Sequence, residues 1–440
     1  MKLSGWGRFP VLEAAVFAPR NESALIERVR AGRLIARGNG RAYGDSAISR
    51  QNTVHMRHFD RMLAFDEATG QLVAEAGVLL DDVIRALLPR GWFPAVTPGT
   101  KFVTLGGMVA ADVHGKNHHK AGSLRNFVDW FDLIDASGTV RHCSRTENTD
   151  LFDWTLGGMG LTGVILRVAM RLRPVETAWI RQTVMPAADI DAAIDLLEQS
   201  GDATYSVAWV DCLSKGAKMG RSLILLGEHA LLEELTERQR ESPLRIDRRR
   251  ELEVPFLAPN GLLNGLTARV FNALYYWQGQ RTAGTSLVDW NSYFYPLDVV
   301  LGWNRICGSR GLMQFQCVLP LDRSRIGLKA LLEGISRTPA GPLLAVLKRF
   351  GAQSGGISFP MSGYTLALDL PVGERSLRLM RELDRITLAH DGRFYLAKDS
   401  RMTADTLRQS DARAQKFVQM RDKLAARSAF QSAQSERLAL

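Results

Sequence analysis

The first 174 residues alternate between short apolar runs and stretches rich in polar residues and glycine. This pattern is typical of short strands and helices that follow one another closely. Three apolar runs predict strands, at residues 34–37, 70–77 and 128–138. Residues 81–91 (DDVIRALLPRG) predict a helix instead, because carboxylates stand in its first turn and Gly91 stands at its end.

After about residue 175 the alternating stretches become longer. Four of them predict strands, at residues 205–211, 221–229, 312–320 and 363–372. Helices are predicted at residues 190–200 and 375–392. This succession favours an α+β fold in which a largely antiparallel sheet is covered by helices. We predict a first domain (1–175), a second domain (176–393) and a C-terminal segment (394–440) that is mostly one charged amphipathic helix.

Two glycine-rich segments interrupt the first domain. The first, LIARGNGRAYGDSA, places Gly38 and Gly40 directly after a predicted strand. Glycines at alternate positions let successive main-chain N–H groups point at an anion such as a pyrophosphate, although a purely structural turn explains the pattern equally well. The second, residues 97–128, contains Gly106 and Gly107 and lets a flat ring or a diphosphate approach the main chain closely.

A third glycine cluster, Gly158-x-Gly160-x-x-Gly163, has the spelling of the Rossmann dinucleotide motif. That motif needs a helix after the glycines and an acidic residue about 20 positions on. Residues 164–174 (VILRVAMRLRP) instead alternate like a strand, and the residues near position 182 are not acidic. We therefore predict no Rossmann fold.

The composition narrows the function classes. The net charge of +10 favours an anionic partner, which can be nucleic acid, an acidic membrane surface or a phosphorylated substrate. A nucleic-acid-binding protein without catalysis is the alternative class, but lysine and arginine are dispersed and no nucleic-acid-binding motif is recognisable in the sequence.

His114, His118 and His119 lack a partner at a metal-ligand spacing, so we predict no metal site. Four cysteines without a C-x-x-C pair and no apparent secretory leader favour a cytoplasmic protein.

Residues 254–280 carry one charge, Arg269, and follow a basic run at residues 245–250. Prolines, asparagines and glycines interrupt the segment, so it is not a membrane span. Two interpretations stay open. The segment rests on an anionic membrane surface at the inner face of the membrane, or it packs on its own domain.

The glycine segments, in this order, resemble the FAD-binding domain of the vanillyl-alcohol oxidase family of flavoproteins. The stretches PGT, GG and HGKNHH-AGS, followed by AWVD, FYPLD, GWNR, QFQ, LKRFG, SFP and YLAKDSR, extend the resemblance over almost the whole chain. They are most similar to the branch of that family that oxidises polyprenyl-phosphate-linked ribose. The resemblance implies a two-subdomain FAD-binding domain, a substrate domain, and a C-terminal segment that returns to the FAD-binding domain.

The resemblance also implies residue roles. The FAD-binding residues it implies are Arg37, Gly38, Asn39, Gly40, Arg41, Ala42, Tyr43, Pro98, Gly99, Thr100, Thr104, Gly106, Gly107, Ala111, His114, Gly115, Asn117, His118, Gly158, Gly160, Gly163, Val164, Ile165 and Lys398. The catalytic candidates are Lys398, with Tyr395 one helical turn earlier, His114 and Lys116. The substrate-binding candidates are Tyr43, Trp209, Tyr295, Gln314, Gln316, Lys348, Thr365 and Ala367.

Three positions depart from the family pattern. Arg41 stands where members with covalently attached flavin carry a histidine, so we expect non-covalent FAD. Thr365 and Ala367 stand where the ribose-oxidising branch has asparagine and cysteine, so the pocket wall is altered.

The expected reaction is oxidation of the ribose 2′-hydroxyl to a ketone, the first half of an epimerisation to the arabinose form used in cell-envelope polysaccharide. A short-chain reductase would be the partner that completes it. The alternative within the same class is a soluble sugar, alditol or lactone oxidase with non-covalent FAD.

Overall fold

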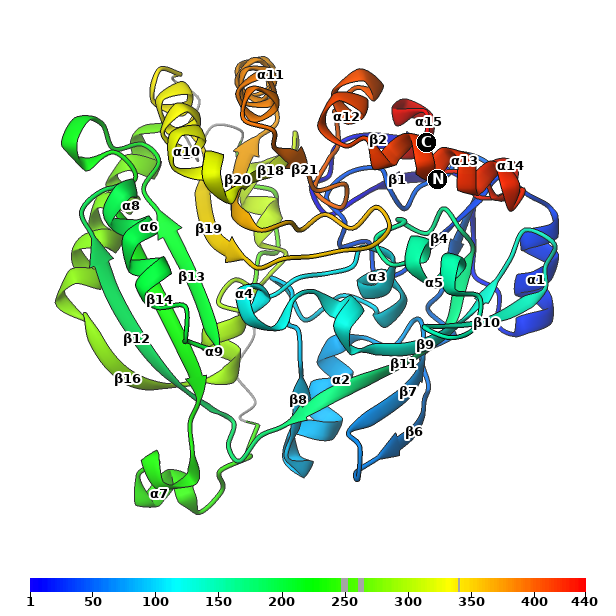
Figure 1. Cartoon of the computed structure of the whole chain (residues 1–440), viewed down its shortest axis with the longest axis horizontal. Coiled ribbons are helices and arrows are strands. Elements are labelled where there is room, and N and C mark those ends of the chain that lie inside the picture. Colours follow the sequence, from blue (N-terminus) through cyan, green and yellow to red (C-terminus); the bar gives the residue numbers. More distant parts are fainter. Residues whose placement is uncertain (247–251, 260–264, 339–340) are drawn as a thin grey trace.

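The computed structural model describes residues 1–246, 252–259, 265–338 and 341–440. Figure 1 shows an N-terminal part in blue and cyan, a second part in green and yellow beside it, and the red C-terminal helices lying over the N-terminal part. Helices and mostly antiparallel sheets occur together, which confirms the predicted α+β class.

A small parallel sheet begins the N-terminal part. Its strands, in spatial order, are β3 (Val16–Phe17), β5 (Asn52–His55) and β4 (Leu34–Arg37). Helix α1 (Glu22–Arg30) packs on it through Leu25 and Val29. The Asn21 side chain begins this helix by accepting the N–H of Ala24 at 2.9 Å.

An antiparallel sheet forms the rest of the N-terminal part. Its strands are β6 (Met62–Asp66), β7 (Gln71–Glu75), β8 (Trp92–Pro94), β9 (Val128–Ile134), β10 (Val140–Ser144) and β11 (Val164–Pro174). They lie in the order β10-β9-β11-β7-β6, and β8 pairs with the far end of β11. Because the glycines at 158–163 lead into β11 and not into a helix, the exclusion of a Rossmann motif is confirmed.

Short helices connect these strands. The helix predicted at residues 81–91 is α2 (Leu80–Leu87), which continues as the 3-10 turn η1 (Leu88–Arg90) because Pro89 cannot continue the α-helical hydrogen bonding. Gly91 ends it with a left-handed φ of 82°. The other helices here are α3 (Leu105–Ala110), α4 (His118–Ala121), η2 (Leu124–Phe127) and α5 (Thr149–Thr155).

The second part is built on an eight-stranded sheet in which all neighbouring strands are antiparallel. In spatial order its strands are β16 (Gly284–Asp289), β12 (Trp179–Ala187), β14 (Ser222–His229), β13 (Tyr205–Val210), β19 (Leu344–Phe350), β20 (Gly363–Pro371), β18 (Leu312–Pro320) and β21 (Arg393–Phe394). The four strands predicted from the alternating stretches are therefore confirmed.

The two faces of this sheet have different neighbours. Helices α6 (Ile190–Gln199), α10 (Leu321–Ser336) and α11 (Glu374–Ala389) bury one face in an apolar core (Figure 1). Helix α8 (Gly265–Arg281) packs on part of the opposite face, against β12 and β14. The rest of that face is turned towards the N-terminal part, where Gln314 reaches Tyr43 and Gln316 reaches His114.

The remaining elements are small. They are β1 (Lys2–Ser4), β2 (Val11–Glu13), η3 (Gly216–Lys218), η4 (Leu232–Glu234), α7 (Glu237–Arg240), β15 (Leu252–Glu253), α9 (Trp290–Phe294), β17 (Val300–Leu301) and η5 (Trp303–Cys307). The main-chain N–H of Leu312, at the start of β18, donates to the carbonyl of Gly7 at 2.7 Å. The chain start is thereby attached to the second sheet.

The C-terminal segment is not one helix, so that prediction was wrong. It forms α12 (Ala404–Ser410), α13 (Arg413–Lys423), α14 (Ala426–Ala429) and α15 (Ala433–Leu438). Asp411 ends the first by accepting the N–H of Arg413 at 3.0 Å, which starts the next helix. Ala425 is left-handed at φ 51°, which ends α13. The segment rejoins the N-terminal part at β4, where the Gln431 N–H donates to the carbonyl of Leu34 at 2.8 Å.

No helix in the described ranges is both long enough and apolar enough to cross a membrane.

Candidate active site

The loop after β4 has the form of an anion cradle. The main-chain N–H groups of residues 38–42 have no hydrogen-bond acceptor within the described residues. Gly40 has a left-handed φ of 64°, and a Cβ there would overlap the Arg37 guanidinium. That guanidinium in turn fixes the loop by donating to the carbonyl of Ser4 at 2.7 Å. A row of unpaired N–H groups is a site for a negatively charged group.

The second glycine segment closes against this loop. A Cβ on Gly38 would overlap the hydroxyl of Thr104, and the Asn39 amide donates to the carbonyl of Phe102 at 2.8 Å. Thr104 caps α3 by accepting the N–H of Gly107 at 3.3 Å. Gly106 packs on Ala76 so closely that a Cβ would lie 2.8 Å from its methyl carbon. The sequence thus brings two segments together that are separated by more than fifty residues.

The other glycines serve two purposes. Gly158 and Gly163 pack against main-chain carbonyls, and Gly160 faces Ile35 of β4, whose Cδ1 would lie 3.4 Å from an added Cβ. Val164 and Ile165 follow as buried residues of β11. Gly99 differs, because an added Cβ would have no neighbour within 4 Å. The main chain at residue 99 therefore borders open space.

Several buried polar atoms around this cradle have no partner within the described residues. They are Arg41 Nε, Thr97 Oγ1, His114 Nδ1, Asn117 Oδ1 and His118 Nδ1. Because buried polar atoms are normally satisfied, such a group indicates a missing polar ligand. The Arg41 guanidinium also lies over the rings of Trp6 and Phe102, at 4.2 and 5.0 Å from their centres. Residues 38–42 and these atoms fit a long polar cofactor with a diphosphate and a flat ring.

Next to the cradle lies a cationic centre made of Lys116, Lys348 and Lys398. Burial lowers the pKa of Lys398 to about 8, and the charge of Asp369 opposes this shift. Burial, followed by the charge of Lys398, lowers the pKa of Lys348 to about 8. Burial, followed by the charge of Lys348, lowers the pKa of Lys116 to about 7. These lysines can exchange protons near neutral pH.

The lysines are held by different elements. Lys398 lies in a turn after β21, where its N–H donates to the carbonyl of Tyr395 at 3.0 Å, and its Nζ lies 4.2 Å from the ring centre of Tyr43. The next N–H, that of Asp399, donates to the carbonyl of Leu396 at 3.2 Å, so Tyr395 and Lys398 lie one short turn apart, outside any assigned helix. Lys116 donates to the carbonyl of Tyr293, and Lys348 lies on β19.

His114 contacts the polar face of the second sheet. Its Nε2 lies 3.2 Å from the Gln316 amide, which also donates to the hydroxyl of Thr365 at 3.2 Å. Burial, followed by the charge of Lys348, places the pKa of His114 well below its usual value, so the ring is neutral. Its Nε2 then accepts from Gln316 and the proton resides on Nδ1. Tyr395 contacts His114 only through its ring, because its hydroxyl donates to the carbonyl of Ala111 at 3.0 Å.

Asp369 is a residue of this centre that sequence reasoning missed. It lies on β20 opposite Gln314, whose amide donates to its carboxylate at 2.7 Å and to the Tyr43 hydroxyl at 3.2 Å. Burial raises the pKa of Asp369 to about 6, against the effects of Gln314 and Lys398. The sequence did contain a signal for Asp369: residues 365, 367 and 369 alternate along one strand, so Asp369 shares a face with the two predicted pocket residues.

Two predicted pocket residues lie away from the lysines. Tyr295 is fully buried, packs against Trp290 and Phe294, and its hydroxyl has no partner within the described residues. Trp209 lies in an apolar cluster beneath α8 and contacts the ring of Tyr275, with the ring centres 4.8 Å apart. The structure therefore brings together Tyr43, Gln314, Gln316, Lys348, Lys398 and His114, whereas Tyr295 and Trp209 lie further along the interface.

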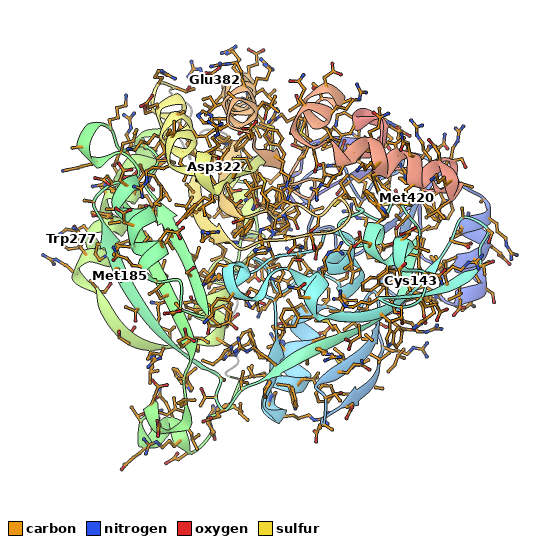
Figure 2. All side chains as sticks on the ribbon, viewed as in Figure 1. Cys143, Met185, Trp277, Asp322, Glu382 and Met420 are labelled. Carbon is orange, nitrogen blue, oxygen red and sulfur yellow. The ribbon has the colours of Figure 1, made fainter. Side chains whose placement is uncertain are left out.

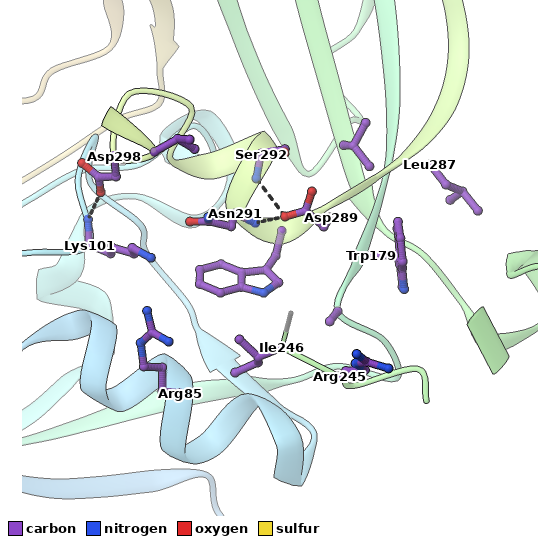
Figure 3. A pocket seen from close by; sticks show the side chains of 14 residues that line it. Arg85, Lys101, Trp179, Arg245, Ile246, Leu287, Asp289, Asn291, Ser292 and Asp298 are labelled. Carbon is purple, nitrogen blue, oxygen red and sulfur yellow. Dashed lines mark hydrogen bonds between the residues drawn. The ribbon is translucent and has the colours of Figure 1, made fainter. Parts of the chain in front are cut away.

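A cavity of about 660 Å³ lies between the two parts, and Figure 3 draws the side chains of the 14 residues that line it. Two of its charged groups have partners: Lys101 Nζ lies 3.1 Å from Asp81, and Asp298 accepts from Thr100 at 3.0 Å and from the Lys101 N–H at 2.8 Å. None of the three lysines of the cationic centre lines it. The lining of this cavity and the cationic centre therefore share no residue.

Comparison with known proteins identifies the class. Residues 13–144 match the family model described as an FAD binding domain. The whole chain is 36% identical to decaprenylphosphoryl-beta-D-ribose oxidase of Mycolicibacterium smegmatis and covers 97% of it. An uncharacterized protein of Streptomyces coelicolor is 35% identical over 82% of the chain and is covered completely. L-gulonolactone oxidase of Mus musculus is 32% identical over 31% of each chain.

These matches define an FAD-dependent oxidoreductase that acts on a CH–OH group. The family expected from the motifs is confirmed, and so is FAD as the cofactor. The chain belongs to the family of FAD-binding oxidoreductases that includes decaprenylphosphoryl-beta-D-ribose oxidase.

Proposed function

We propose that this protein oxidises the 2′-hydroxyl of a polyprenyl-phosphate-linked ribose to a ketone. The observation that carries the proposal is the polar, cationic floor at which Lys398, Gln316 and His114 meet the cradle. Gln314 and Gln316 point to the same side of β18 and supply amides for sugar hydroxyls. The whole-length similarity to the ribose oxidase supports this substrate class.

FAD would be held non-covalently, with its diphosphate on the N–H groups of residues 38–42 and its ring beside Gly99 and Lys398. Arg41 supports the non-covalent mode, because a guanidinium packed between two aromatic rings is no nucleophile for flavin attachment. When bound, FAD supplies the acceptor for the hydride that leaves the sugar carbon. The protein supplies position, charge and a base.

Lys398 is the proposed base. Its lowered pKa of about 8 leaves roughly one tenth of the side chain neutral at pH 7, and in that form its Nζ can accept the hydroxyl proton. Lys348 is the proposed partner of the substrate phosphate, because it lies opposite Thr365, whose hydroxyl accepts from the Gln316 amide at 3.2 Å. His114 and Lys116 line the side of the centre that comes from the second glycine segment. Tyr395 orients that side by packing against the His114 ring.

The keto product requires a reductase to complete an epimerisation to the arabinose form. We propose a short-chain reductase as that partner, because a keto sugar is an ordinary substrate for hydride transfer from a nicotinamide cofactor.

We also propose peripheral contact with an acidic membrane at the cytoplasmic face. α8 exposes an outer stripe made of Val270, Leu274 and Trp277, each at least half exposed, and Trp277 stands at the edge of the molecule in Figure 2. The charged residues of α8 are Arg269 and Arg281, both positive. An apolar stripe flanked by cations suits an anionic lipid surface.

Vesicle sedimentation tests this contact. Replacing Leu274 and Trp277 together by serine is expected to reduce binding to phosphatidylglycerol vesicles while flavin content stays unchanged. Equal binding by the variant would leave only packing as the role of α8.

A substrate panel tests the main proposal. Oxidised enzyme is mixed without oxygen with polyprenyl-phosphoryl ribose, polyprenyl-phosphoryl arabinose and free sugars, alditols and lactones, and the loss of flavin absorbance is followed. The lipid-linked ribose is expected to bleach the flavin fastest. Bleaching by a free sugar or a lactone alone would instead assign the soluble-substrate activity, which the match to L-gulonolactone oxidase favours.

A further inference from the structure

The face of the second sheet that is turned towards the N-terminal part changes from cationic to apolar along strand β19. Lys348, Val346 and Leu344 alternate on β19 and therefore point to the same side. All three are only half buried although they lie in the middle of the sheet. A phosphate at Lys348 would thus stand at the edge of an accessible apolar surface.

The same surface continues across the strands. Gln316 lies opposite Ala367, Ala367 lies opposite Val346, and Val346 lies opposite Trp209. Opposed residues of antiparallel strands share a face, and three strand spacings separate Gln316 from Trp209 by roughly 15 Å. The side chains between them, Ala367 and Val346, are small or branched and project only a short distance from the sheet. This row of side chains leads from the proposed sugar site towards α8.

Aromatic rings extend this row to the surface. Trp209 contacts Tyr275 edge-on with ring centres 4.8 Å apart, and Tyr275 stacks on Phe271 with centres 5.8 Å apart. Tyr275 is 37% exposed and Phe271 is 53% exposed, so the path ends in solvent. No acidic residue occurs on α8, and the helix is about 25 Å long. The path is therefore apolar from Val346 to the outside.

We propose that the isoprenoid chain of the substrate lies over Val346 and Leu344, reaches the buried ring of Trp209 at the edge of α8, and leaves the protein along Tyr275 and Phe271. This inference rests on the proposed lipid-linked substrate and adds the place of its chain. The order of chemistry on the protein matches the order on the ligand: amides and lysines for the sugar and phosphate, then branched and aromatic side chains for the isoprene units.

The test compares chain lengths on the full-length, FAD-loaded enzyme. Ribose joined through phosphate to a ten-isoprene or a two-isoprene chain is supplied in the same detergent. Phe271→Ser is expected to raise KM for the long chain by about tenfold, the loss from exposing one large apolar side chain, with kcat and the short-chain KM unchanged. Tyr275→Ala is the second variant, because it removes the ring that joins Trp209 to Phe271.

Ile326→Ser is the matched control, because Ile326 is 66% exposed on α10, on the other face of the sheet. Equal effects of Phe271→Ser on both chain lengths, or no effect on either, would overturn the inference. So would loss of vesicle binding with an unchanged long-chain KM in detergent, because the ring path would then serve only the membrane. If the unaltered enzyme oxidises neither substrate, the proposed function itself fails, and this is seen before any variant is made.

Discussion

Asp369→Asn is the substitution that tests most directly whether Lys398 acts as a base. The carboxylate is buried beside Gln314, Tyr43 and Lys398, and asparagine removes its charge at nearly constant size. With a pKa of about 6, Asp369 is about 99% ionised at pH 8, so the variant loses a full negative charge there. That charge raises the pKa of Lys398, against the larger effect of burial. Without it the pKa of Lys398 falls further.

The expected size follows from the neutral fraction of Lys398. A pKa of about 8 leaves roughly one tenth of Lys398 neutral at pH 7. Removing one nearby opposite charge lowers such a pKa by about one unit or more, which leaves at least half of Lys398 neutral at pH 7. Flavin reduction should therefore be about fivefold faster in the variant at pH 7 and equal to that of the unaltered enzyme above about pH 9.

Stopped-flow measurement of flavin absorbance at saturating substrate, from pH 6 to 10, gives this profile. Asp322→Asn is the control, because the Asp322 side chain is 77% exposed on α10 and its loss changes the net charge equally. An acid limb that stays at the same pH, or moves to higher pH, in Asp369→Asn would refute the argument that Asp369 acts through the charge of Lys398.

Three further outcomes are expected. Lys398→Ala should retain FAD while substrate-driven bleaching falls by about 10²–10⁴-fold, measured by single-turnover absorbance; unchanged bleaching would remove Lys398 from the mechanism. Gly38→Ala should purify with much less FAD, read from the ratio of flavin to protein absorbance, because the added Cβ meets Thr104; Gly373→Ala, where an added Cβ has no neighbour within 4 Å, should keep its flavin. Arg437→Ala should lower the free energy of unfolding in urea by about 3–5 kcal/mol, because Arg437 pairs with two buried carboxylates at 2.7 and 2.9 Å; a change below about 1 kcal/mol would contradict this.

Local patterns sufficed for much of the fold. The alternation of residues 164–174 predicted β11, and that strand alone removes the Rossmann interpretation of Gly158. The first two glycine segments were identified from small residues and spacing, and the structure brings Gly38 against Thr104. Such features depend on neighbours in sequence, which explains why they are legible without a structure.

Long-range pairing determined what could not be predicted. Asp369 joins Gln314 only because β20 pairs with β18 in one register, and a shift by one residue would turn it to the opposite face. Tyr295 is buried because α9 docks on the N-terminal core, which no local pattern records. Asp411 reads as an ordinary helical residue until its side chain is seen to start a new helix. The roles assigned to the site residues stay predictions.

The turn that carries Lys398 has a consequence for biosynthesis. The Tyr43 N–H donates to the carbonyl of Ala397, and Arg437 pairs with Asp45, so the cofactor loop packs against residues that are translated long after it. Contacts between such distant residues form slowly. Until those residues have been translated, the cofactor loop of the N-terminal part therefore lacks these contacts. Flavin is expected to bind only after residues 397–437 have been translated, and a variant that lacks them should fold its sheets but purify without flavin.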